Sequence, residues 1–120
     1  MRDYRFYVED SSRRGRMNDP TVASLVTGSC GDTMEFYLVI KDDFIETAWY
    51  YADGCAATEA CGAFVAEWVE GLKIQEALRI SPYEVITYLK ELPEDHYHCA
   101  VLAVLSFLKS AGEYMLLPKY

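Results

Sequence analysis

Long apolar runs are missing from this 120-residue sequence, and no stretch approaches the roughly 20 uncharged apolar residues that a membrane-spanning helix needs. The first residues, MRDYRFYVEDSS, lack the apolar block of a secretory signal. Basic residues are also scarce, because 11 Lys and Arg stand against 19 Asp and Glu. The net charge of −8 gives little electrostatic support for binding a phosphate backbone. We therefore expect a cytoplasmic protein whose partners include neither a membrane nor nucleic acid.

Three sequence signatures are absent as well: a glycine-rich phosphate loop, a Cys-x-x-Cys pair and an internal repeat. Their absence argues against nucleotide-binding enzymes, the commonest zinc modules and solenoids. With 120 residues, of which 52% are hydrophobic, the chain is long enough for one core and too short for two comfortable domains. The sequence predicts a single domain over residues 1–120.

The first 19 residues are mostly polar and contain Gly15 and a run of serines and arginines. We expect them to form a loosely packed arm that carries the aromatic residues Tyr4, Phe6 and Tyr7. After this arm, runs of β-branched and aromatic residues predict strands at 22–27, 34–40 and 44–51. The acidic pair at 42–43 separates the last two runs and predicts a tight hairpin.

The hydrophobic period changes from two to 3.6 at Cys55, which predicts a helix from 56 to about 71. Shorter helices are expected at 74–78 and after the Ser81-Pro82 pair, where serine caps the helix and proline takes its first position. A last helix, apolar nearly all round, is expected from about 96 to 111 and to stop at Gly112. The fold class is α+β: a three-stranded antiparallel β-meander packed against C-terminal helices.

Three of the four cysteines fall where an element ends. Cys55 and Cys99 start predicted helices, where free N–H groups and the helix dipole favour a thiolate, so we expect both to be easily deprotonated. Cys30 lies in a glycine-flanked loop, with Asp32 two residues on. If these ends converge, three sulfur ligands meet there, and Asp32 or His98 fills a fourth position. Such a set suits zinc or an iron–sulfur cluster.

Each of these residues also has an ordinary structural interpretation. Free cysteines are among the most buried residue types, and Cys61 lies on an apolar helical stripe, so we assign it to the core. A role for Cys61 as a spare sulfur ligand is the minor alternative. Alone, His98 is typical of a surface or capping position and Asp32 of a turn. His96 is expected to be solvated, with a secondary ligand role left open.

Three segments resemble, in order and with matching separations, the cysteine motifs of the NifU/IscU-type iron–sulfur cluster assembly scaffolds. They are GSCGDTMEFYLVI, DGCAATEACGAFVAEWVEGLKIQEAL and LPEDHYHCAVLAVLSFLKSA. The resemblance extends over about 15–111 and includes Cys30-Gly31-Asp32, Gly54-Cys55 and His98-Cys99.

The resemblance implies a scaffold, not an enzyme, on which a labile [2Fe–2S] cluster is built and then passed to recipient apo iron–sulfur proteins. It assigns Cys30, Cys55 and Cys99 as cluster ligands and Asp32 and His98 as candidate non-cysteine ligands. Sulfur would come from a cysteine desulfurase, and Cys99 is the acceptor that we expect to carry it as persulfide, because that step needs an exposed thiolate. Zinc is expected to occupy the same ligands in the isolated protein.

The sequence departs from the family pattern in places that affect its partners. LPEDH replaces the Leu-Pro-Pro-Val-Lys that a dedicated Hsp70-type chaperone recognises in bacterial and mitochondrial members, so we do not predict that chaperone as a partner. The alternative is a zinc-dependent sulfur acceptor that relays persulfide without building a cluster. The chain lacks the segment that this related branch adds between Cys55 and Cys99, which favours the scaffold. An interaction module with structural cysteines also remains open.

Overall fold

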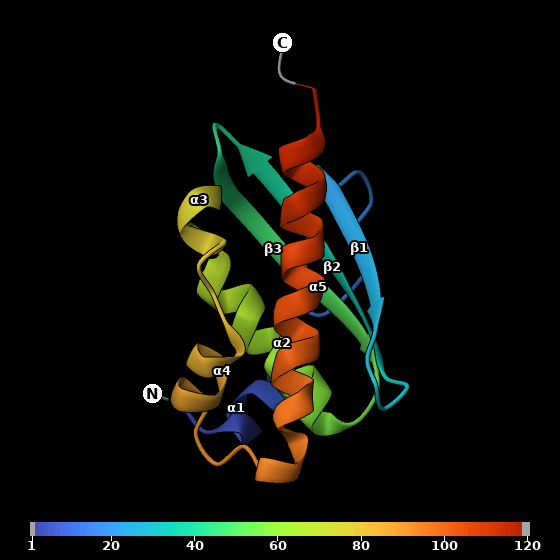
Figure 1. The fold of residues 1–120 in the computed structure, drawn as a ribbon, viewed down its shortest axis with the longest axis vertical. Coiled ribbons are helices and arrows are strands. Elements are labelled where there is room, and N and C mark those ends of the chain that lie inside the picture. The colour runs from blue at the N-terminus through green and yellow to red at the C-terminus, as the bar shows by residue number, and fades with distance from the viewer. Residues whose placement is uncertain (1, 119–120) are drawn as a thin grey trace.

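The computed structural model describes residues 2–118, in which a three-stranded antiparallel sheet carries helices on one face (Figure 1). The elements in chain order are α1 (Tyr4–Glu9), β1 (Val22–Thr27), β2 (Thr33–Lys41), β3 (Phe44–Asp53), α2 (Ala56–Val69), α3 (Ile74–Ala77), α4 (Pro82–Tyr88), the 3₁₀ turn η1 (Glu94–His96) and α5 (Tyr97–Leu116). The α+β class and the predicted meander are confirmed, since the strand order is β1-β2-β3.

The strands alternate between a buried face and a more exposed face, as the period of two predicts. In β2 every second residue from Met34 to Ile40 is buried. The β2–β3 hairpin turns at Asp42 and Asp43, whose φ angles are 54° and 65°. Positive φ at both central residues defines a type I′ turn, which matches the right-handed twist of the strands it joins.

The core lies between the sheet and the two long helices, α2 and α5. The α2 helix packs on β3 and on α5, and α5 packs on β1 and β2. A close approach at Gly62 fixes the position of α2, because a Cβ there would lie 2.5 Å from Cδ2 of the buried Tyr50 ring. The helices that carry the later cysteines are therefore held firmly against the sheet.

Two expectations about the last helix are wrong. Gly112 does not stop α5, which continues to Leu116. The cost of a helical glycine, about 1 kcal/mol relative to alanine, is small beside the packing of the buried Ala111 and the hydrogen bond from Tyr114 to Asp43. The helix is also not buried all round, because Val101 and Leu105 are 40% and 50% exposed.

The segment Glu94–Leu116 is long and apolar enough to cross a membrane, and an 18-residue window within it has a mean hydropathy of 1.4. Half of this window is buried inside the protein. Length and composition alone do not separate a membrane span from a core helix. Its packing on β1, β2 and α2 accounts for the buried half.

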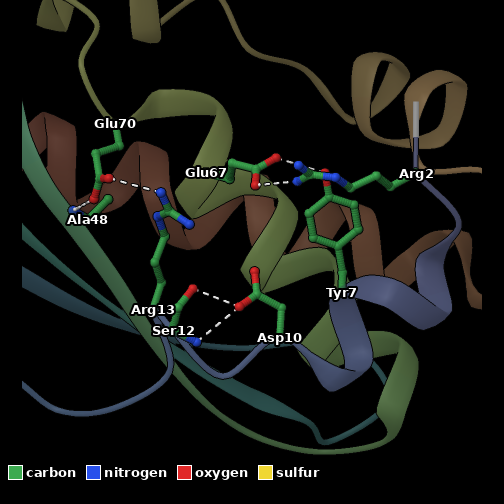
Figure 2. A network of polar contacts seen from close by, with 8 residues as sticks. All are labelled: Arg2, Tyr7, Asp10, Ser12, Arg13, Ala48, Glu67 and Glu70. Carbon is green, nitrogen blue, oxygen red and sulfur yellow. Dashed lines mark hydrogen bonds and ion pairs between the residues drawn. The ribbon is translucent and has the colours of Figure 1, made fainter.

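The N-terminal arm is more ordered than the sequence analysis expected. Residues 4–9 form α1, which packs on α2, and Tyr7 is only 4% exposed. Figure 2 shows Arg2 and Tyr7 directed at Glu67 of α2, and the Tyr7 hydroxyl donates to Glu67 Oε1 at 2.7 Å. Farther along, Arg13 pairs with Glu70 at 3.0 Å. The buried Tyr7 and the ion pairs of Arg2 and Arg13 with α2 together fasten a segment whose composition is mostly polar.

Tyr7→Ala provides a direct test of this packing. We expect it to lower the free energy of unfolding by about 3 kcal/mol, as for other buried aromatic residues. Tyr7→Phe removes only the hydrogen bond to Glu67 and is expected to cost about 1 kcal/mol. Urea denaturation of both variants measures the difference. If Tyr7→Ala is as stable as the parent chain, the arm is loosely packed, as the sequence analysis expected.

Candidate metal centre

The loop that holds Cys30 and the start of α2 lie at the same end of the sheet. Strand pairing requires this, because Thr33 at the start of β2 faces both Thr27 at the end of β1 and Asp53 at the end of β3. The first turns of α5 reach the same end, which is the lower end in Figure 1. Segments that are 25 to 44 residues apart (30 to 55, and 55 to 99) thus meet in one place.

Cys55 is the N-cap residue of α2 and is exposed. Partial burial raises the pKa of its thiol, but hydrogen bonds from the Thr58 hydroxyl and from the N–H groups of Thr58 and Ala57 outweigh this effect. The net pKa lies below that of an ordinary cysteine. The expectation that Cys55 is readily deprotonated agrees with this geometry.

Cys99 behaves in the opposite way. It lies in the first turn of α5 but is fully buried, and burial raises the pKa of its thiol to about 11. Thr58 lowers this pKa, while the neighbouring Cys55 raises it. The expectation that Cys99 is an easily deprotonated, exposed thiol is therefore wrong for this conformation. Desolvation of the sulfur outweighs the favourable helix terminus.

Asp32 reaches the start of α2 from the β1–β2 loop. Its Oδ2 accepts a hydrogen bond from the Thr58 hydroxyl at 2.6 Å and lies 3.4 Å from the Cys55 backbone nitrogen. The Thr58 contact is the main reason that the pKa of Asp32 is lowered, so the carboxylate is charged at neutral pH. Gly54 makes the approach feasible, because a Cβ at that position would lie 2.6 Å from Asp32 Cγ.

Thr58 links three of the candidate ligands, and the sequence analysis missed it. Its buried hydroxyl oxygen lies 2.6 Å from Asp32 Oδ2, 3.3 Å from Cys99 Sγ and 3.4 Å from Cys55 Sγ. A hydroxyl has one proton to donate, so the Asp32 carboxylate and the two sulfurs are alternative acceptors for the Thr58 hydroxyl. The sequence did contain a signal for Thr58: it lies three residues after Cys55, and residues three apart are neighbours on a helical surface.

Of the two histidines, His96 lies nearer the sulfurs, which agrees with the ligand role that the sequence analysis left open for it. His96, which was expected to be solvated, places Nδ1 3.9 Å from Cys55 Sγ and 4.0 Å from Cys99 Sγ. Ligand atoms of His96, Cys55 and Cys99 all lie within 4.8 Å of one another. His98 is exposed and lines a separate groove of about 270 Å³ with Val101 and Leu105.

Cys30 and Cys61 lie outside this inner group. Cys30 is exposed on the loop, and its thiol is near enough to the Asp32 carboxyl to help lower the pKa of that carboxyl, which places Cys30 beside the site. Cys61 is fully buried in the core, as expected, and burial raises the pKa of its thiol well above the ordinary value. The structure therefore brings Cys55, Cys99 and Asp32 together and adds His96.

This donor set fits a soft or borderline metal. Two sulfurs and an imidazole nitrogen, with a carboxylate oxygen close by, are the ligand types of tetrahedral zinc and of iron–sulfur sites. Within residues 2–118, Cys55, His96 and Cys99 form the group of three ligand residues that meets at metal-binding distances. The exposure of Cys55 leaves a path from solvent to a site whose far side is the buried Cys99.

Comparison with known proteins identifies the family. Residues 7–119 match the family model described as the NifU-like N terminal domain. The chain belongs to this family. It is 33% identical over 100 residues to the iron-sulfur cluster assembly scaffold protein IscU of Escherichia coli K12, covering 81% of this chain and 77% of that one.

Archaeal relatives and solved structures agree with this assignment. The chain is 32% identical over 107 residues, or 89% of its length, to the iron-sulfur cluster assembly scaffold proteins IscU 1 and IscU 2 of Archaeoglobus fulgidus, and it spans 65% of the length of each. Its fold matches the N-terminal part of a nitrogen-fixing NifU-like protein from Brucella abortus with a TM-score of 0.74 and 19% identity, covering 93% of this chain and 91% of that one. The NifU/IscU resemblance and the fold expected from it are thus confirmed.

Proposed function

We propose that this NifU-like domain is a scaffold on which an iron–sulfur cluster, of the [2Fe–2S] type, is assembled and from which it is passed to other proteins. The observation that carries the proposal is the meeting of Cys55, Cys99 and His96 ligand atoms within 4.8 Å, with Asp32 joined to them through Thr58. Its named relatives in Escherichia coli and Archaeoglobus are cluster assembly scaffold proteins.

The mixture of ligands supports transfer over permanent storage. Four cysteine ligands hold a cluster durably, whereas carboxylate and imidazole ligands replace thiolates with weaker and more exchangeable bonds. Cys30 is exposed on a loop beside the site and is placed to add a further thiolate when iron arrives. We infer that the site binds a cluster firmly enough to build it and loosely enough to release it.

Sulfur acceptance needs an exposed thiolate, and Cys55 now fits this need better than Cys99. In this step the Cys55 thiolate attacks the outer sulfur of a persulfide on a cysteine desulfurase. A new S–S bond forms at Cys55, the desulfurase S–S bond breaks, and the desulfurase thiolate leaves. An external dithiol, which closes to its disulfide, then supplies the two electrons that cleave the Cys55 persulfide, so that the Cys55 thiolate is regenerated and the released sulfide is available to iron.

Anaerobic reconstitution tests the proposal. The purified chain is mixed with ferrous iron, cysteine, dithiothreitol and a cysteine desulfurase, and iron, acid-labile sulfide and visible absorption are measured. A scaffold is expected to gain sulfide-to-iron charge-transfer bands, with iron and sulfide bound in equal amounts, as a [2Fe–2S] cluster requires. Subsequent addition of an apo ferredoxin is expected to remove these bands from the scaffold. Iron bound without acid-labile sulfide would contradict the assignment.

A zinc-dependent sulfur acceptor is the second candidate, because two sulfurs, one nitrogen and one oxygen also complete a tetrahedral zinc site. The reconstitution separates the two functions. A relay protein gains persulfide on Cys55, located by peptide mass spectrometry, and retains zinc while no charge-transfer band develops. In both cases we propose that the four free cysteines operate in a reducing compartment such as the cytoplasm.

A further inference from the structure

We propose that the free edge of β1 and the neighbouring side of α5 bind a second copy of this chain, so that two chains form a symmetric dimer. The inference does not rest on the proposed function. In the sheet that residues 2–118 form, β1 has a neighbouring strand on one side only. Native edge strands carry charges, prolines or bulges that discourage pairing with another chain. The strand VASLVT has no charged residue and no proline, and its register with β2 runs without a shift from Val22 to Thr27.

The hydrogen bonds of the sheet determine which backbone groups of β1 face outward. Tyr50 in β3 bonds the N-terminal arm through both its N–H and its C=O. Its cross-strand partner Phe36 therefore directs its own N–H and C=O away from β3 and toward Ser24 in β1. Because successive residues of a strand direct these groups to opposite sides, the residues on either side of Ser24 present theirs to the free edge.

Ala23, Leu25 and Thr27 thus offer their backbone N–H and C=O groups along the edge. Their side chains are exposed, that of Leu25 by 53%. The C=O of Leu25 accepts a hydrogen bond from Lys109 Nζ at 3.0 Å, which agrees with its outward direction. Holding an exposed lysine in one position costs side-chain entropy, so an incoming strand can displace it.

The charge pattern of the chain favours a second copy as the partner. The two longest stretches without Asp, Glu, Lys or Arg are 20–31 and 96–108, and they contain β1 and the first half of α5. They meet in a groove of about 270 Å³ that is lined by residues 26–29 and by His98, Val101, Leu102 and Leu105. Each copy carries a net charge of −8, so two copies repel least where both surfaces are uncharged. A basic partner would find no carboxylate among the described residues that line this groove.

A two-fold axis through Leu25 lets the two edges pair with each other. With antiparallel strands, Leu25 lies opposite Leu25 of the second copy, and each Ala23 lies opposite Thr27 of the other copy. All of these pairs join two outward-facing residues, and such a pair exchanges both of its N–H to C=O hydrogen bonds. The two three-stranded sheets then form one continuous sheet. The hydrogen bond from Lys109 is replaced by one from the Leu25 N–H of the other copy.

The same axis brings the two α5 helices into contact on one face of the joined sheet. Each α5 packs on β1 and β2, so its axis lies one strand spacing, about 4.8 Å, from the two-fold axis. The two helices are then about 10 Å apart, which is an ordinary distance for packed helices. Val101 and Leu105, which are 40% and 50% exposed in the single chain, lie on the side that faces the other helix. The dimer therefore buries apolar side chains that the core of one chain leaves uncovered.

The two metal centres stay apart in this dimer. The paired strands run in opposite directions, so the end of β1 beside one metal centre lies next to the start of β1 of the other copy. The centres therefore lie at opposite ends of the joined sheet, and each keeps its own ligands.

Sedimentation equilibrium of the full chain tests the inference, with dithiothreitol present and with and without EDTA to exclude links through disulfides or metal. The mass is expected to rise from monomer to dimer with concentration. Leu25→Lys is expected to weaken the dimer by at least about 10-fold, because two like charges then face each other across the axis. Tyr83→Lys is the matched control, since it adds the same charge to α4 at a residue that is 72% exposed, and it should keep the parent affinity. Lys109→Met is expected to strengthen the dimer by roughly fivefold, the factor that one competing hydrogen bond represents.

Amide hydrogen exchange locates the interface in the parent chain. The Leu25 N–H is expected to exchange more slowly as the chain concentration rises, while that of Ser24, which faces β2, stays slow throughout. A monomer mass at every concentration up to the solubility limit would overturn the inference. So would a dimer that Leu25→Lys leaves intact or that Tyr83→Lys weakens equally, because the contact would then lie elsewhere or depend on net charge alone. Circular dichroism checks the fold of each variant, and if a variant is unfolded, the exchange of Leu25 in the parent chain decides.

Discussion

Cys55→Ser and Cys99→Ser are each expected to lower the affinity of the chain for zinc by more than about 100-fold. A structural zinc site of four ligands contributes roughly 10–16 kcal/mol, so one ligand accounts for about 3 kcal/mol. Serine keeps the shape of cysteine but does not supply a thiolate at neutral pH. The measurement is competition with a chromophoric chelator under anaerobic conditions.

Cys61→Ala is the matched control for these variants. Cys61 lies on the same helix as Cys55 and is as buried as Cys99, but it belongs to the core and not to the metal group. Its replacement is expected to reduce the free energy of unfolding by about 1 kcal/mol and to leave zinc affinity unchanged. Urea denaturation of all three metal-free variants separates lost stability from lost ligation. Equal zinc affinity in Cys61→Ala, Cys99→Ser and Cys55→Ser would mean that the cysteines are structural.

Thr58→Val is expected to weaken zinc binding by about 10- to 100-fold without removing any metal ligand. Outer groups that orient the ligands of a metal have effects of this size. The Thr58 hydroxyl holds the Asp32 carboxylate beside the two sulfurs, and valine has the same shape without the hydroxyl. Thr58→Ser restores the hydroxyl and is expected to restore most of the affinity.

Thr58→Val is also expected to change the reactivity of Cys55 in the metal-free protein. The Thr58 hydrogen bond lowers the pKa of Cys55, so its loss raises that pKa and leaves less thiolate at pH 7. Loss of one hydrogen bond worth about 1 kcal/mol corresponds to roughly fivefold slower alkylation of Cys55 by iodoacetamide. The difference in alkylation rate should disappear at a pH above the Cys55 pKa of both the parent chain and Thr58→Val, because the thiol is then fully ionised in each protein.

Peptide mass spectrometry resolves this reaction at Cys55 from the reaction at the exposed Cys30. Thr58→Ser is again the control, since its hydroxyl should return the rate profile toward that of the parent chain. Identical pH profiles for Thr58→Val and the parent chain would show that the hydroxyl does not act on the sulfur. Thr58 would then be an ordinary buried residue of α2.

The order of strands and helices was predictable because it follows from local patterns. Alternation over 22–27, 34–40 and 44–51 matched β1, β2 and β3, and the change of period at Cys55 matched the start of α2 at Ala56. The end of α5 was less predictable, because a glycine that is unfavourable by itself is tolerated in a helix whose neighbouring residues, such as Ala111, are buried against the core. The arm was mispredicted for a similar reason, since the burial of Tyr7 depends on a distant helix.

At the site, the sequence identified which chemical groups are present and near which helix ends they lie. Cys55 at a helix start, Cys30 in a glycine-flanked loop and Asp32 beside it were all readable from spacing. The resemblance to the NifU/IscU scaffolds, now confirmed by the family match over 7–119, supplied the expected function. None of these steps required knowledge of which side chains touch.

The sequence by itself determined the elements, the family and the supply of sulfur, nitrogen and oxygen ligands, because these depend on residues that are near one another in the chain. Only the tertiary structure decided that Cys99 is buried, that Thr58 joins Asp32 to both sulfurs and that His96 Nδ1 lies near both of them. Desolvation and side-chain direction depend on segments up to 41 positions apart in sequence (58 to 99, and 55 to 96) that fold into contact. Those contacts set the pKa of each thiol and the geometry offered to a metal, and no local pattern records them.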